Sequence, residues 1–503
     1  MGSRILGFVR DLMIANVLGA GMVTDAFFMA FKFPNLFRRL FGEGAMNAAF
    51  VPLYTKKLEE EGPIAAKQFA GDVASVLLTF MLAFTLLSMW GMPWILSVVA
   101  RGFLENQIKF DLTVALAQIT FPYLLFMVIA ALLSGMLNSI GKFWAAAAAP
   151  IILNIILITG LLLAFFNIIT MPEYMLAYGV ALAGAAQFLF LVLACHNSDI
   201  MIRLWWPRLT PNVKYMLTLM APGVLGAGVV QINVLVGDFL ASHLGDGSVS
   251  YLYYADRVNQ LPLGVIGVAV GIALLPLLTR QLRAGDDGAA MDSCNRSLEI
   301  SLLLTLPATA ALIAIPWPIV SVLFERGSFD SHAAIMTANA LQAYAIGLPA
   351  YVLVKAISPG FFAREDTKTP VKVAAFTVIM NIVLASILMQ IWAHVGIALA
   401  TAITSWVNVL FLTVILVRRG HYKMDARLCH AIPRLLTSAI IMGLALWIAG
   451  VWVDRFIHDN ALLSTGILAL MIIGSTIVYF CLVHITGAAN LREIKAMLRR
   501  RKS

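Results

Sequence analysis

Charged side chains inside long apolar runs are the residues of this sequence that could do chemistry. Arg4, Arg10, Arg38 and Arg257 lie in or beside such runs, and Asp25 lies near the start of the second run. An arginine stays protonated and presents a planar fork of N–H donors that binds phosphate oxygens in pairs. An excess of arginine over unpaired acid therefore predicts a site for a phosphate or pyrophosphate and disfavours a cationic drug.

Burial in a membrane restricts what these charges can do. A charge at the bilayer centre costs roughly 2.5–3.5 kcal/mol, so each must line a watery cavity, pair with another charge or reach an interface. Arg4, Arg10 and Arg38 could instead extend to the membrane surface, as long basic side chains do near helix ends. Asp256 offers Arg257 a structural ion pair, and simple solvation would explain Asp25 near the outer end of its helix.

Asp238 and Asn381 are candidate ion-coupling residues. Asp238 follows Gln231 and Asn233 in one apolar run, and together with Asn154 or Asn381 it could bind a cation or carry a proton. Hydrogen bonding between helices explains the two asparagines equally well.

Nothing in the sequence indicates a metal centre, a nucleotide site or an enzyme. The four cysteines are far apart, the eight histidines are scattered, and no GxxxxGK[ST] loop is present. We therefore expect no cofactor, with a coupling cation or the membrane potential as the source of drive. The net charge of +9 is explained by basic loops, so we expect no nucleic acid as a partner.

The composition is that of a membrane protein. Hydrophobic residues make up 61% of the 503 residues and charged residues 12%, against about 25% charged in soluble domains. Long continuous apolar runs predict an all-α polytopic membrane protein with about fourteen transmembrane helices. The expected ranges are 1–19, 23–47, 70–99, 111–137, 143–167, 174–195, 213–243, 249–279, 297–324, 333–361, 371–392, 395–417, 430–453 and 461–485.

Basic residues set the expected orientation. Most of the 35 Lys and Arg fall in one alternate set of loops and in the tail, while the opposite set holds only Arg101, Lys109, Arg326 and Arg455. The positive-inside rule then places both termini in the cytoplasm.

A partial internal repeat predicts two lobes. Asn35 and Pro52 match Asn259 and Pro276 at a constant offset of 224, and Phe27 falls on Tyr251. Repeated halves with a site between them are common in secondary transporters. The expected divisions are a six-helix lobe at 1–200, a second six-helix lobe at 201–425, an additional helix pair at 426–486 and a basic cytoplasmic tail at 487–503.

Several motifs together resemble the MurJ (MviN) family of lipid II flippases, within the superfamily of multidrug, oligosaccharidyl-lipid and polysaccharide exporters. The resemblance covers essentially the whole chain. The motifs are Ser3-Arg4-Ile5-Leu6-Gly7-Phe8-Val9-Arg10-Asp11, Thr24-Asp25-Ala26-Phe27-Phe28, Lys32-Phe33-Pro34-Asn35-Leu36-Phe37-Arg38-Arg39, Tyr253-Tyr254-Ala255-Asp256-Arg257 and Asp366-Thr367-Lys368-Thr369-Pro370.

The resemblance implies movement of lipid II, an undecaprenyl-pyrophosphate-linked precursor, from the inner to the outer leaflet of the bacterial cytoplasmic (inner) membrane by alternating access. It implies that Arg4, Arg10, Asp25, Arg38 and Arg257 bind the substrate, the arginines gripping its pyrophosphate. Cell-wall synthesis proteins are further expected partners. The family pattern has two departures here: the start looks short, and Gln260 stands where some members have an acid.

Rival functions differ in substrate or class. A flippase for lipid-linked polysaccharide repeat units is the nearest alternative, followed by a cation-coupled drug exporter. A membrane scaffold that transports nothing is a third, and it would tolerate loss of the arginines.

Overall fold

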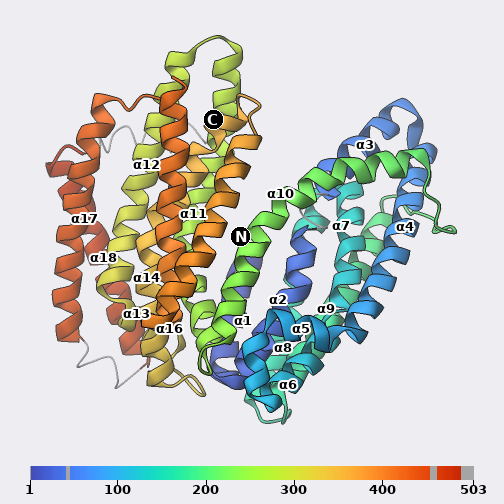
Figure 1. Cartoon of the computed structure of the whole chain (residues 1–503), viewed down its shortest axis with the longest axis horizontal. Coiled ribbons are helices and arrows are strands. Elements are labelled where there is room, and N and C mark those ends of the chain that lie inside the picture. Colours follow the sequence, from blue (N-terminus) through green and yellow to red (C-terminus); the bar gives the residue numbers. More distant parts are fainter. Residues whose placement is uncertain (1, 41–45, 454–460, 489–503) are drawn as a thin grey trace. The chain divides into compact units, whose positions relative to one another are not determined.

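The computed structural model describes residues 2–40, 46–453 and 461–488, and this part of the chain is helical without a β-strand (Figure 1). The all-α prediction is therefore confirmed. The helices are α1 (Gly2–Leu18), α2 (Met22–Phe37), α3 (Met46–Glu60), α4 (Gly62–Trp90), α5 (Met92–Val99), η2 (Arg101–Glu105), α6 (Gln107–Thr120), α7 (Tyr123–Ser139), α8 (Phe143–Phe165), α9 (Pro172–His196), α10 (Pro211–Ser242), α11 (Ser248–Arg283), α12 (Asp287–Ala314), α13 (Pro316–Phe324), α14 (Ser331–Ile357), α15 (Pro359–Phe362), α16 (Lys368–Arg418), α17 (Ala426–Val453) and α18 (Ala461–Ile485).

Within the described ranges, nine helical stretches are long and apolar enough to cross a membrane. One of them, α16, contains 51 residues, which at 1.5 Å per residue is more than twice the thickness of a bilayer core. Its backbone breaks at Trp392 and Ala393, where Ala393 has a φ of 47°. The two predicted spans 371–392 and 395–417 are thus the two halves of α16, and the total of fourteen spans stays a prediction.

The second predicted helix, 23–47, covers α2 and the start of α3, and its residues 41–45 lie outside the described residues. Helix α3 continues beyond the predicted range to Glu60. Lys56 and Lys57, expected in a loop, lie on α3 and form ion pairs one turn along with Glu60 and Glu61. Exposed pairs at this spacing support a helix without a membrane around it.

The described chain divides into two compact units. The first comprises residues up to Ser250 together with Arg326–Asp330, and the second comprises Tyr251–Glu325 and the chain from Ser331 onward. In the first unit α1 packs on α8, α2 on α6, and α7 on α9. In the second unit α14 packs against both α12 and α16. The predicted domain boundaries stay predictions, and residues 489–503 of the predicted tail lie outside the described residues.

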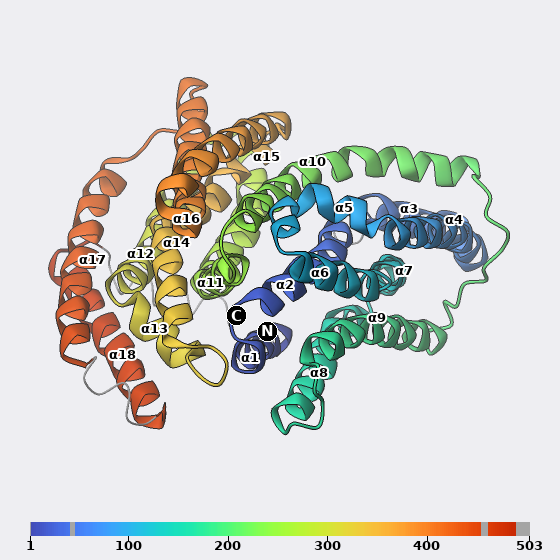
Figure 2. The ribbon, with the colours of Figure 1, turned by 60° about the horizontal axis from the view of Figure 1, so that its bottom comes forward.

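The C-terminal helices α17 and α18 pack on each other and on α12 and α13 (Figure 2). An ionic network fixes this attachment in the second unit. The buried carboxylate of Glu299 accepts from Arg296 and, at 3.0 Å, from Arg427. Asp425 binds Arg296 as well and caps the start of α17 by accepting from the Leu428 amide at 2.7 Å. The pair is therefore tied to α12 by charge as well as by apolar packing.

Candidate functional site

Arg10 is held in a buried cluster of the first unit. Its Nη2 lies 2.7 Å from Asp11 Oδ1, and its Nη1 donates to Asn154 Oδ1 of α8 at 3.2 Å. Asn154 in turn donates to the Ser3 carbonyl at 3.1 Å, so one amide fixes α1 at both its first turn and its middle. The guanidinium also lies 5.7 Å from the centre of the Phe31 ring. This arrangement sets the position and the rotamer of Arg10.

The other predicted cations of the first unit are more accessible. Arg4 is exposed in the first turn of α1, and Arg38 is half-buried at the end of α2, where its Nε donates to Asn35 Oδ1 at 3.3 Å. Arg4, Arg10 and Arg38 thus lie on the two N-terminal helices.

Asp25 is fully buried and fastens α2 to the start of α11. Its Oδ1 accepts from the amide and hydroxyl of Ser250 at 2.9 and 2.6 Å, and its Oδ2 accepts from the Gly247 amide at 2.8 Å. The first amides of a helix have no partner within it, and an anion there is stabilised by the helix dipole. We call this group, Asp25 with Gly247, Ser250 and Lys109, the Asp25 clasp.

Lys109 completes the clasp and was missed as a site residue. Its ammonium lies 2.8 Å from both Asp25 Oδ2 and Asp246 Oδ1, and 4.1 Å from the centre of the Phe103 ring. The sequence placed Lys109 among the few cations of the outer loops, but it lies in the first turn of α6 and is buried. The sequence feature that could have pointed to Lys109 is its place in the set of loops that holds few other cations. Direct contact of Asp25 with a substrate stays a prediction.

The C-terminal end of α1 is capped by residues distant in sequence. The Ser328 amide donates to the Asn16 carbonyl at 2.8 Å, and the Ser328 hydroxyl donates to the Val17 carbonyl at 3.1 Å. Gly19 and Gly327 make this approach feasible: both have φ near 65°, at 69° and 61°, and a Cβ on either would lie 2.3 Å from an oxygen of the other segment. The last carbonyls of a helix need such partners.

Arg257 is the predicted site residue of the second unit. It lies on α11, half-buried, with Nη2 donating to the Tyr253 hydroxyl at 2.8 Å and its guanidinium 4.8 Å from the centre of that ring. The side-chain amide of Gln260 donates a hydrogen bond to the carboxylate of Asp256, the residue before Arg257. The ring and the hydroxyl of Tyr253 therefore hold the guanidinium close to α11.

The two candidate ion-coupling residues lie in different units. Asp238, on α10 of the first unit, is buried and forms an ion pair with Lys32 of α2. Asn381, in the first half of α16, is buried and accepts from the Thr404 hydroxyl of the second half at 3.4 Å. Asn381 therefore joins the two halves of α16 across the break.

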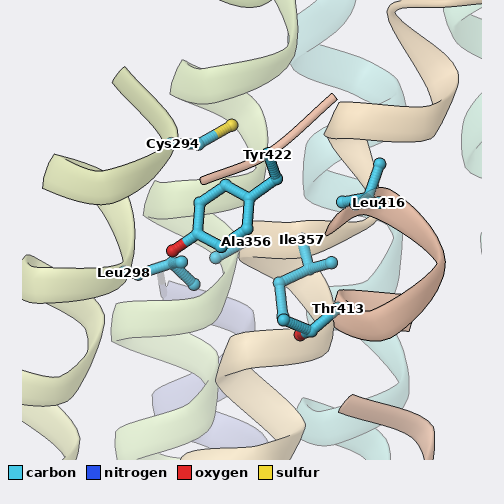
Figure 3. Close-up of a pocket in the computed structure, with 7 residues that line it drawn as sticks. All are labelled: Cys294, Leu298, Ala356, Ile357, Thr413, Leu416 and Tyr422. Carbon is cyan, nitrogen blue, oxygen red and sulfur yellow. The ribbon is translucent and has the colours of Figure 1, made fainter. Parts of the chain in front are cut away.

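One cavity among the described residues of the second unit is too small for a lipid-linked sugar. It lies among α12, α14, α16 and the segment before α17, and Figure 3 shows the Tyr422 ring and the Cys294 thiol at its edge. Its water-accessible volume is about 10 Å³, enough for about one water molecule. In the described ranges, no group of three or more His, Cys, Asp or Glu could hold a metal ion.

Outside the membrane spans, Asp366 fastens the ends of α16 together. Its carboxylate accepts from the Thr369 hydroxyl at 2.6 Å, from Arg419 Nη1 at 2.6 Å and from the Thr369 amide at 2.9 Å. These bonds, that from the Thr369 hydroxyl first, hold the pKa of Asp366 well below its usual range. The Asp366-Thr367-Lys368-Thr369-Pro370 motif is thus a joint that positions α16.

Comparison with known proteins gives matches along nearly the whole chain. A family model described as lipid II flippase MurJ matches residues 14–465. A probable lipid II flippase MurJ of Rhizobium meliloti (strain 1021) is 45% identical over 505 residues, covering 99% of this chain and 94% of the relative. The lipid II flippase MurJ of Burkholderia cenocepacia is 33% identical over 452 residues, covering 89% of this chain and 87% of the relative.

Solved structures agree with these sequence matches. A lipid II flippase MurJ in an inward closed conformation has a TM-score of 0.79 at 28% identity, with 96% of each chain covered. An inward-facing MATE family multidrug transporter of the MOP superfamily has a TM-score of 0.67 at 14% identity, covering 83% of this chain and 95% of the other. The second likeness concerns the fold alone.

Proposed function

The chain belongs to the MurJ family of lipid II flippases, and from this premise we propose that it moves lipid II from the inner to the outer leaflet of the cytoplasmic membrane. The family match over residues 14–465 is the observation that carries the proposal. Transport of an intact lipid needs binding and release but no covalent step, and the proposed role of every charged residue is accordingly to bind, to pair or to hold a helix.

The arginines supply the cations for the pyrophosphate. Arg4 and Arg38 are accessible, Arg10 is held in a defined rotamer, and Arg257 is held against the Tyr253 ring. A pyrophosphate oxygen competes with Asp11 for the Arg10 guanidinium, and a paired N–H fork suits such an anion. A lysine substitution retains the charge but not the fork, so the grip depends on arginine itself.

Alternating access needs contacts that hold one state and open in the next. The Asp25 clasp and the Ser328 cap are the candidates, because both join helix ends through hydrogen bonds that water can replace. Opening the clasp frees the start of α11, the helix that carries Arg257. We propose that this step links the position of Arg257 to the opening of the outer face.

The proposed location is the bacterial inner membrane, with both termini in the cytoplasm. The orientation is tested by single cysteines at Arg208 and at Asn106 in a background without Cys195, Cys294, Cys429 and Cys481. A thiol reagent that does not cross the membrane should label position 106 and spare position 208 in intact cells. Binding to cell-wall synthesis proteins stays a prediction.

Purified chain in lipid vesicles tests the substrate. We expect lipid II in the inner leaflet to become accessible from outside at least about 10-fold faster than in empty vesicles, a change worth about 1.4 kcal/mol in barrier height. A lipid-linked polysaccharide repeat unit should stay at the empty-vesicle rate. The reverse preference would replace lipid II by the polysaccharide substrate, and no acceleration of either would remove the flippase proposal.

A further inference from the structure

Lys32 and Asp238 form an ion pair in the part of the first unit built from α2 and α10. The Lys32 ammonium donates to Asp238 Oδ1. The Asp238 side chain is 9% exposed and that of Lys32 24% exposed. Among the described residues, Lys32 is the cation that Asp238 contacts.

The residues that flank the pair in sequence are apolar and buried. They are Phe31 and Phe33, next to Lys32 on α2, and Leu240, two residues beyond Asp238 on α10. A carboxylate in such a place needs a compensating charge, because an unpaired buried ion is strongly destabilising. The long lysine stem allows the ammonium to reach across to α10 while its methylene groups remain among apolar side chains.

The geometry points to Lys32 as a built-in counter-ion that occupies the position of a coupling cation at Asp238. Asp238 is a residue at which the sequence predicts a bound cation or a proton. With Lys32 in place the carboxylate is already neutralised, and the ammonium cannot diffuse into solution because it is covalently part of α2. The chain therefore needs no monovalent cation from solution at this residue. The consequence for transport rests on the proposed flippase function, whereas the binding statement does not.

Purified full-length chain in detergent tests the binding statement without any lipid II. The thermal midpoint is measured at pH 8 in NaCl and in choline chloride of equal ionic strength. We expect the same midpoint in both salts for the parent chain, within about 1 °C, because a ligand stabilises a protein only where it binds the folded state. A sodium-specific rise that Asp238→Asn abolishes would overturn the inference.

A double-mutant cycle tests the pairing itself. Lys32→Met and Asp238→Asn should each lower the midpoint by about 5 °C, because each leaves one buried charge without its partner. The double variant Lys32→Met/Asp238→Asn, which removes both charges, should recover at least half of that loss. If a single variant fails to fold, recovery of folded protein in the double variant supports the pair, and no recovery contradicts it.

Lys56→Met is the matched control, because Lys56 loses an exposed ion pair with Glu60 by the same substitution. Its midpoint should change by less than about 1 °C. Transport is then measured in vesicles with NaCl or choline chloride. Equal lipid II rates for the parent chain in both salts support the inference, and a parent rate that requires sodium contradicts it. A chain that flips no lipid II in either salt would remove the proposed function while the midpoint data still decide the pairing.

Discussion

A substitution at Asp25 tests whether this single buried carboxylate holds the start of α11. In Asp25→Asn the new amide group places N–H donors toward the Lys109 ammonium or the backbone donors of the clasp, and the ion pair is lost. We expect the free energy of unfolding to fall by about 3 kcal/mol, the usual effect of removing one partner of a buried pair. A fall in the thermal midpoint in detergent reports this loss of stability.

Asp111→Asn is the control for this substitution, because Asp111 lies on the same helix as Lys109 and its contact with Gln107 is exposed. It should leave the midpoint nearly unchanged. If Asp25→Asn and Asp111→Asn behaved alike, the clasp would not be a source of stability.

Asp366 makes the stability of the folded chain depend on pH. Its pKa is depressed in the folded chain, so the carboxylate contributes stability above the unfolded value of about 4, and that stability is lost as the pH falls through the depressed value. Asp366→Asn should cost about 1 kcal/mol at pH 7, since the site is partly open to solvent. The gap between parent and variant should close on acidification below pH 4. A stability gap that widened toward low pH would contradict a stabilising carboxylate with a depressed pKa at Asp366.

Residue types were predictable at this scale, but residue partners were not. Hydropathy alone picked out Arg10, Asp25 and Asp238, because a charge in an apolar run is conspicuous. Lys109 and Ser250, the partners of Asp25, lie 84 and 225 residues away along the chain. No local period relates such positions, and only the folded chain brings them together.

The segment 326–330 caps the C-terminal end of α1, and a substitution at Gly327 tests this contact. In Gly327→Ala the new Cβ would lie 2.3 Å from Asn16 Oδ1, and the residue would keep a positive φ of 61°. The φ alone costs roughly 1–2 kcal/mol for a residue with a side chain. The contact adds to that cost, so the cap on α1 should be lost and the thermal midpoint should fall.

Gly420→Ala separates the two causes. Gly420 has a φ of 71° and nothing within 4 Å of the added Cβ, so this variant pays the backbone cost alone. The fall in midpoint for Gly327→Ala should exceed that for Gly420→Ala. Equal falls would mean that the contact with Asn16 contributes nothing.

Helix positions were largely predictable because apolar run length is a direct signal for a span. The break in α16 at Trp392 and Ala393 lies where the predicted spans 371–392 and 395–417 meet. The extension of α3 to Glu60 was missed, since Lys56 and Lys57 were interpreted as loop cations. Packing of α3 on α4, α7 and α10 and its ion pairs one turn apart stabilise this segment as a helix.

For the molecule as a whole, we expect the membrane potential to change the rate of lipid II export. Moving one charge through 100 mV is worth about 2.3 kcal/mol, and a pyrophosphate leaving a negative interior gains about twice that if both charges cross the field. An inside-negative potential imposed on vesicles should therefore speed export of lipid II. Equal rates at zero and imposed potential would exclude the potential as the source of drive.

The class of fold was accessible from composition, and the family from joint motifs spread along the chain. Composition indicates how many apolar helices exist, whereas packing decides which helices group together. Helix α10 is an example: it packs on α3, α4 and α5 within the first unit. Side-chain packing between distant helices is not encoded in hydropathy.

A complementation experiment in living bacteria decides whether this chain moves lipid II with its arginines. The resident lipid II flippase of a bacterium is depleted, and the parent chain, Arg10→Ala, Arg257→Ala and the exposed loop control Arg208→Ala are expressed at matched membrane levels. The readout is lipid II accessible on the outer leaflet. We predict that the parent and Arg208→Ala restore export and that Arg10→Ala and Arg257→Ala fail by about 10-fold or more. Export restored equally by all four chains would contradict the arginine grip, and a well-expressed parent that restores nothing would contradict the function itself.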